Sequence, residues 1–276
     1  MKILALVSVM AVAAFAMTDA APQIGVTQPG VDTWLEEIAY FDLEGGGIPN
    51  AYTVGCGWDG VDFWITNGAG QAGSSTGMFY IFDHDGILTD SFPQVNAPGW
   101  GLRDLCCDGT YMYGSVSSSI DYYDITTRAK VGNFIGPISP NRALAYDGTH
   151  FYTSSFSTDV YQLIWDGVSG STAASTIWST AATSAYGAAW DALGDCLWVT
   201  SANGSGILDQ IAADGSLIAH HTLSGLSTMG GATMAGMYPV NELYVLAQGS
   251  PDAMHGYDVN PVALQRDTWG SIKVLF

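Results

Sequence analysis

Two arginines and one aspartate have the residue types and the spacing of an anion-binding site. Arg103 and Arg142 each lie five residues before the Asp of a repeated motif, so they hold equivalent positions in neighbouring repeats, and Asp104 follows Arg103 directly. The chain carries 7 Lys and Arg against 26 Asp and Glu, a net charge of −19. Two guanidinium groups at one level can bind an anion or a carboxylate. The alternative is structural, with both arginines paired to Asp104 or to loop carbonyl groups, because ion-pair networks also gather charge.

Two of the four cysteines have the spacing of a disulfide between neighbouring repeats. Cys56 lies three residues before its motif Asp, and Cys106 lies two before its own. Side chains alternate between the two faces of a strand, so these positions point to opposite faces of their units. Neighbouring units meet through opposite faces, which predicts a Cys56–Cys106 bond with Cys107 and Cys196 as free or buried thiols. Four buried, reduced cysteines are the alternative.

An internal repeat of about 44 residues positions these side chains. Its copies begin with small or apolar residues and an Asp: Cys56-Gly57-Trp58-Asp59-Gly60, Cys106-Cys107-Asp108-Gly109, Leu144-Ala145-Tyr146-Asp147-Gly148 and Ala188-Ala189-Trp190-Asp191. An aromatic residue follows in each copy and in a degenerate fifth: Trp64, Tyr113, Tyr152, Trp198 and Tyr244. Each copy continues with further β-prone runs, about four short strands in all, which is the size of one propeller blade. We assign the repeated Asp residues to turns, where a carboxylate accepts backbone N–H groups.

The repeat resembles those of secreted β-propellers built from NHL- or YVTN-type repeats. The resemblance is carried by Gly187-Ala188-Ala189-Trp190-Asp191 followed by Leu197-Trp198-Val199-Thr200, and it covers roughly residues 34–262. It implies that the first strand of each blade is innermost and lines a central channel, with Arg103, Arg142 and Asp104 near one mouth. It leaves the function open, because propellers host unrelated activities.

The fold class predicted for residues 34–262 is therefore all-β, a five-bladed β-propeller with four-stranded blades. The fifth copy lacks a clear fourth strand, and the segment from Leu35 to Leu43 lacks three strands before it. We expect this N-terminal segment to complete the last blade, which closes the ring and removes exposed edges. A separate N-terminal strand on an open solenoid is the alternative.

Residues for acid–base or metal chemistry are sparse on the expected inner strands. The four Glu are Glu36, Glu37, Glu44 and Glu242, and the five His are His84, His150, His220, His221 and His255. None falls on an inner strand, and Asp104 has no obvious carboxylate partner of the kind that glycosidases need. His220 and His221 are strand neighbours that point to opposite faces, so they cannot easily share a metal. We expect no catalytic residues, no metal and no other cofactor.

The N-terminus predicts export. Lys2 precedes an apolar run, Ile3 to Ala16, that is too short for a transmembrane helix and ends in a small-x-small cleavage pattern. Residues 1–21 are interpreted as a signal peptide and 22–33 as a leader, with an uncleaved anchor as the alternative. Apolar residues are 48% of the chain and charged residues 12%, which excludes a disordered chain. The charge of −19 argues against nucleic acid and against anionic lipid as partners.

The predicted function is a secreted, non-enzymatic structural or binding module of the cell surface or of an extracellular assembly. Its partners would be further copies of itself, an extracellular protein or a glycan. One alternative is an exported hydrolase or lyase with an axial active site. Another is a carbohydrate-binding propeller that uses Trp58, Trp100 and Trp190, which lie near loops.

The C-terminal tail, residues 263–276, is surplus to the predicted ring and strongly β-prone at its end. In an extended form Ile272, Val274 and Phe276 share one face, with Trp269 slightly upstream. An exposed segment of this composition would favour aggregation, so we expect it to be buried against another surface. Three alternatives remain open: the tail folds back on its own ring, it serves as a sorting signal, or it adds as a strand or plug to a neighbouring subunit. In the last case, head-to-tail contacts that do not close into a ring build a filament.

Deletion of residues 264–276 separates these possibilities. If the tail mediates assembly, the deletion abolishes the polymer seen by size-exclusion chromatography and electron microscopy while circular dichroism still reports a folded ring. A parent protein that is monomeric at every concentration would contradict assembly through the tail.

Overall fold

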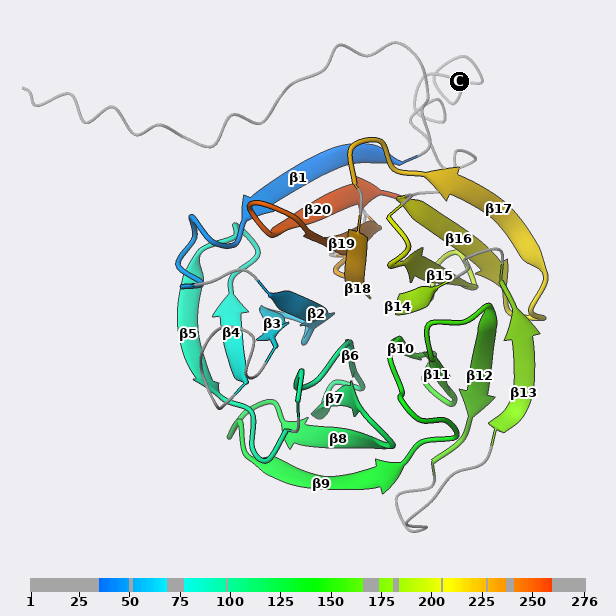
Figure 1. Cartoon of the computed structure of the whole chain (residues 1–276), viewed down its shortest axis with the longest axis horizontal. Coiled ribbons are helices and arrows are strands. Elements are labelled where there is room, and N and C mark those ends of the chain that lie inside the picture. The colour runs from blue at the N-terminus through cyan, green and yellow to red at the C-terminus, as the bar shows by residue number, and fades with distance from the viewer. Residues whose placement is uncertain are drawn as a thin grey trace, which may run out of the picture. The chain divides into compact units, whose positions relative to one another are not determined.

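Twenty strands form a ring of five four-stranded antiparallel sheets, each a blade of a propeller (Figure 1). The computed structural model describes residues 35–49, 52–68, 77–97, 99–165, 174–180, 184–204, 206–226, 228–236 and 241–259. This part of the chain contains no helix. It accordingly includes no helix of the length and apolarity needed to cross a membrane. The predicted all-β, five-bladed fold is confirmed.

Blades 1 to 4 follow one another in the chain, and each begins with its innermost strand. Blade 1 contains β2 (Thr53–Trp58), β3 (Phe63–Asn67), β4 (Met78–Phe82) and β5 (Leu88–Pro93). Blade 2 contains β6 (Leu105–Cys107), β7 (Tyr111–Val116), β8 (Ser119–Asp124) and β9 (Lys130–Ile135). Blade 3 contains β10 (Leu144–Tyr146), β11 (Phe151–Ser154), β12 (Asp159–Leu163) and β13 (Ala174–Ser179). Blade 4 contains β14 (Ala185–Asp191), β15 (Cys196–Ser201), β16 (Ile207–Ala212) and β17 (Leu217–Thr222). Blade 5 contains β18 (Thr228–Met234), β19 (Glu242–Gln248), β20 (Ala253–Asp258) and, from the other end of the chain, β1 (Glu36–Asp42).

The repeated Asp ties the first turn of a blade to the aromatic residue that recurs after it. In blade 1, Asp59 accepts the backbone N–H groups of Val61 and Asp62 through Oδ1 and the indole N–H of Trp64 through Oδ2, at 2.7–2.8 Å. The same turn bonds and ring bonds recur around Asp108 with Tyr113, around Asp147 with Tyr152 and, with a longer ring bond, around Asp191 with Trp198. The Asp and the aromatic residue recur together because one carboxylate accepts hydrogen bonds from both the turn and the aromatic side chain. The assignment of these Asp residues to turns is confirmed.

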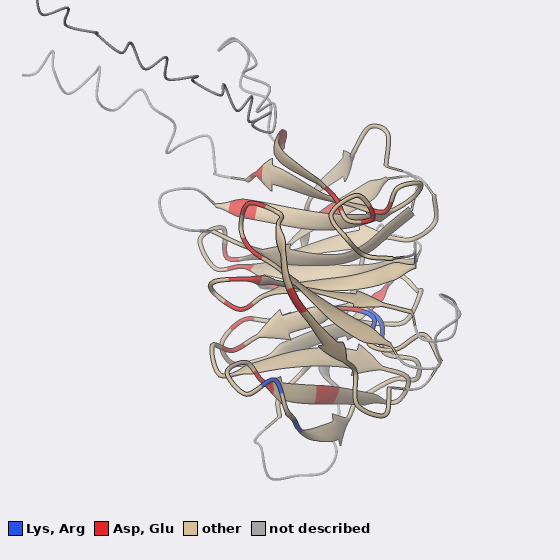
Figure 2. Cartoon of the chain, turned by 90° about the vertical axis from the view of Figure 1, so that its left-hand side faces the viewer, with Lys and Arg blue, Asp and Glu red and all other residues tan. Residues whose placement is uncertain are grey.

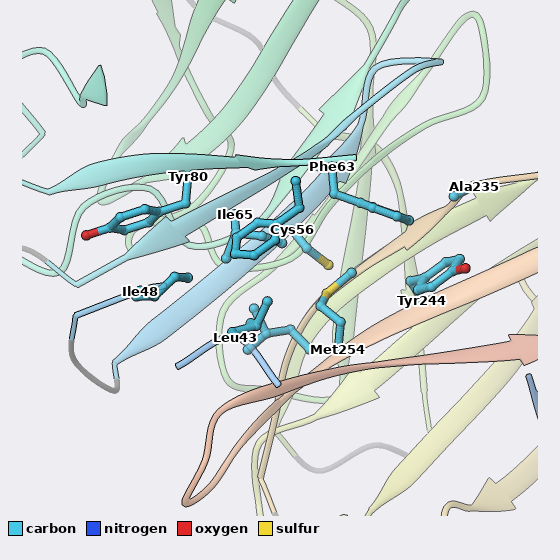
Figure 3. Packing of buried hydrophobic residues seen from close by; sticks show 11 residues of the cluster. Leu43, Ile48, Cys56, Phe63, Ile65, Tyr80, Ala235, Tyr244 and Met254 are labelled. Atoms are coloured by element: carbon cyan, nitrogen blue, oxygen red, sulfur yellow. The ribbon is translucent and has the colours of Figure 1, made fainter. Parts of the chain in front are cut away.

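The N-terminal strand closes the ring, as predicted. Strand β1 pairs antiparallel with β20, with Tyr40 opposite His255 and Phe41 opposite Met254. The ring of Phe41 stacks on Tyr244 of β19, with centroids 5.8 Å apart. Beside it, a buried cluster combines Leu43 and Ile48, which follow β1, with residues of blades 1 and 5 (Figure 3). Closure therefore buries apolar surface as well as pairing the edge strand.

Replacing Phe41 by Ala is expected to weaken the closure. Removing a ring that packs on Tyr244 and against Gly86 lowers the free energy of unfolding by about 2–3 kcal/mol. Ile38, an exposed residue at the bulge of the same strand, supplies the control, and Ile38→Ala should cost under about 1 kcal/mol. Urea denaturation measures both variants. Equal midpoints would show that β1 contributes pairing but little packing.

Candidate functional site

The innermost strands surround the axis (Figure 1). They meet there through very small residues. Four residues before the motif Asp, the blades hold Gly55, Asp104, Ala143 and Gly187, and blade 5 holds Gly231 at this level. A Cβ atom added to Gly55 would lie 2.4 Å from the carbonyl oxygen of Arg103, and one added to Gly187 would lie 2.3 Å from that of Gly230. The backbones are therefore in contact, and Asp104 is the only one of the five with a side chain larger than a methyl group.

The carboxylate of Asp104 lies where the inner strands converge and is fully buried. Its Oδ2 atom accepts the backbone N–H groups of Leu144 at 2.9 Å and Ala188 at 2.8 Å, and Oδ1 accepts that of Ala232 at 3.2 Å. The N–H of Leu105 is a fourth donor. Burial raises the pKa of Asp104 well above its usual range, while these four donors oppose that shift. Asp104 thus joins blades 2, 3, 4 and 5, and its oxygens are engaged by the protein itself.

Two arginines and a tyrosine occupy the level next to Asp104 on three neighbouring blades. Arg103, Arg142 and Tyr186 each lie five residues before their motif Asp. Arg103 bonds to the phenol of Tyr186, and its guanidinium lies 5.3 Å from the centre of the Trp100 ring. That of Arg142 lies 4.7 Å from the centre of Phe156. We call these five residues the arginine mouth. The sequence reasoning found its arginines but missed Tyr186, although the same spacing marks it.

Neither arginine of this mouth is paired with a carboxylate of the described residues. The described chain contains two other basic residues, and both are paired: Arg128 with Asp90, and Lys130 with Asp121 at 2.5 Å. Burial lowers the pKa of Arg103 to about 10, and the positive charge of Arg142 acts in the same direction. The Nε atom of Arg142 is buried without a hydrogen-bond partner in the described structure. The pairing with Asp104 that the sequence left open is therefore not formed.

The opposite end of the channel is a small aromatic cavity of about 80 Å³ lined by residues of all five blades. Trp58, Tyr146 and Trp190 are partly exposed at its wall, and Leu105 and Ala188, two donors to Asp104, also line it. Figure 2 shows many of the acidic segments in turns on the left, with one basic segment on the right and others at the lower left. The three tryptophans considered for carbohydrate binding are thus divided, because Trp100 belongs to the arginine mouth.

The predicted Cys56–Cys106 disulfide is not formed, and all four cysteines are free thiols. Cys56 packs with Leu246 and Met254 of blade 5, whereas Cys106 packs with Leu144 and other residues of blade 3. The alternation of faces was correct, but the assumed direction was reversed. A residue three before the motif Asp faces the preceding blade, and one two before it faces the following blade, so the two thiols point away from each other.

The histidines lie away from the inner strands and have local partners. His84 contacts Glu242, His150 contacts Asp147, His220 contacts Asp209 and His255 contacts Glu37, at 2.6–3.1 Å. His221 packs against the ring of Trp198. Among the residues that the structure describes, no cluster of three His, Cys, Asp or Glu side chains could hold a metal ion. These contacts fit a role of the histidines in packing and turn structure.

Several predicted features lie outside the described residues. They are the signal peptide, the leader and the tail with Trp269, Ile272, Val274 and Phe276. The chain matches no protein-family model, and no curated protein matches it.

Replacing Asp104 by Asn is expected to destabilise the whole ring. The amide places N–H donors among backbone N–H donors and leaves some of these without an acceptor, so the free energy of unfolding should fall by about 3–5 kcal/mol. Asp85→Asn, in an exposed turn, is the matched control and should stay within about 0.5 kcal/mol. Chemical denaturation followed by tryptophan fluorescence measures both. If the two variants unfold alike, Asp104 does not hold the blades together.

Proposed function

We propose that the protein is an exported, non-enzymatic five-bladed propeller that binds a ligand at its arginine mouth. It would act as a binding module of the cell surface or of an extracellular assembly. The propeller fold suits such a role because its rigid inner strands hold side chains from several blades at one level. The expectation of export comes from the apolar run after Lys2.

One observation carries the non-enzymatic part of the proposal: the carboxylate at the axis is already engaged. Four backbone N–H groups bind Asp104, so neither oxygen is placed to exchange a proton with a substrate. Glycoside hydrolysis needs two carboxylates on either side of the bond that breaks. The motif aspartates cannot supply the second readily, because they accept the N–H groups of their own turns.

The remaining channel groups are suited to binding. The arginine mouth presents two charged side chains without carboxylate partners among the described residues, flanked by aromatic rings. The aromatic cavity is less favourable for a sugar. Trp190 stacks parallel to Tyr152 at 5.4 Å, and Trp58 packs tilted against Phe63 at 4.6 Å, so both indole rings already pack against residues of the blades.

A chemically broad panel of compounds tests this function. The purified full-length protein is incubated with neutral oligosaccharides, amines, carboxylates and phosphate, and both the melting temperature and the recovered compound are measured. We expect at least one class to raise the melting temperature by several degrees and to be recovered unchanged. Conversion of a compound, lost in a folded Asp104→Asn variant, would establish an axial enzyme instead.

A further inference from the structure

We propose that the arginine mouth binds a single carboxylate group attached to an apolar moiety; this rests on the binding function proposed above. The chain contains 26 acidic residues, yet the two arginines at this mouth have no carboxylate partner in the described structure. Arg103 is only 9% exposed, so water does little to compensate its charge. A bound anion would supply the negatively charged partner that these two arginines lack in the described structure.

The guanidinium groups are held in fixed orientations before any ligand arrives. Arg103 lies over Trp100 and bonds to Tyr186, while Arg142 lies over Phe156. Each arginine lies two residues before the inner strand of its blade and donates its backbone N–H to the second strand, so the two hold equivalent positions in neighbouring blades. Their charges lie close enough to act on each other and on Tyr186. Planar guanidinium groups bind the two oxygens of a carboxylate with parallel N–H bonds, and fixing them beforehand reduces the entropy lost on binding.

Exposed aromatic residues beside the arginines favour a ligand with an apolar part. Phe156 is 45% exposed and Tyr52, whose ring lies 6.3 Å from that of Trp100, is 42% exposed. Both have backbones in the left-handed region, with φ of 44° and 89°, which is rare for bulky residues and is found at functional sites. The N–H of Tyr52 donates to Asp252 at 2.8 Å, which holds this conformation.

The surroundings select a singly charged group over phosphate. Asp104, one level further in, closes the axis and keeps its oxygens on backbone N–H groups, so the ligand stops at the mouth. The net charge of −19 repels a doubly charged phosphate more than a monocarboxylate. An apolar carboxylate fits both the pair of positive heads and the flanking rings.

Calorimetric titration of the full-length protein with benzoate, benzamide and inorganic phosphate tests the proposal. Benzoate should bind at least tenfold more tightly than either of the other two, and high salt should weaken it. Benzamide keeps the ring but lacks the charge, and phosphate keeps the charge but lacks the ring. Equal affinity for benzoate and benzamide, or tighter phosphate binding, would overturn the assignment.

Variants locate the site. Arg142→Gln and Arg103→Gln should each reduce benzoate affinity at least tenfold, and Arg142→Lys should restore only part of the loss because it lacks the planar fork. Arg128→Gln removes an arginine that is already paired with Asp90 and should change nothing. Arg142 is the less buried of the two, so its variant keeps the test valid if Arg103→Gln fails to fold. An unchanged affinity in folded Arg142→Gln would place the ligand elsewhere.

The panel described under the proposed function distinguishes the two possible failures. If a sugar or an amine binds at this mouth and benzoate does not, the binding role stands and the carboxylate assignment falls. If no class of compound binds, both fall together.

Discussion

One buried carboxylate joins four of the five blades. Asp104 accepts backbone N–H groups from its own blade and from blades 3, 4 and 5, at a level where the inner strands otherwise carry only glycine or alanine. The wedge shape of a propeller requires these small residues, since their backbones are in contact. Close contact of backbones leaves inward N–H groups that need an acceptor. A single carboxylate meets that need and at the same time divides the channel into two separate ends.

The division has a chemical consequence for each end. On one side, the next level of the same strands carries Arg103, Arg142 and Tyr186, with positive charge that no described carboxylate neutralises. On the other side, the strands run out to the motif aspartates and a small aromatic cavity. The two ends of the channel therefore differ in charge, with arginines at one end and the motif aspartates at the other.

The features that could be predicted from the sequence are those with local physical causes. The Asp and the aromatic residue after it recur because they share hydrogen bonds within about ten residues. The repeat of the blades could therefore be recognised in the sequence. The closing strand could be predicted because the fifth repeat lacks a fourth strand of its own. The alternation of side chains does not say which face of an inner strand contacts the preceding blade and which the following one. The disulfide prediction assumed the wrong direction. The role of Asp104 was missed because it depends on donors 40 to 128 residues away.

Closure through β1 also constrains when the protein can fold during synthesis. Blades 1 to 4 are each continuous in the chain, so each can pair its strands as soon as it leaves the ribosome. Blade 5 pairs β1 with β20, and Glu36 lies opposite Asp258, so the first of the described strands must wait for the last of them. Throughout that interval the edge of β1 is open, and Asp104 lacks the donor from Ala232. The pairing of β1 with β20, the hydrogen bond from Ala232 to Asp104 and the contact of Phe41 with Tyr244 can therefore form only once blade 5 has been made.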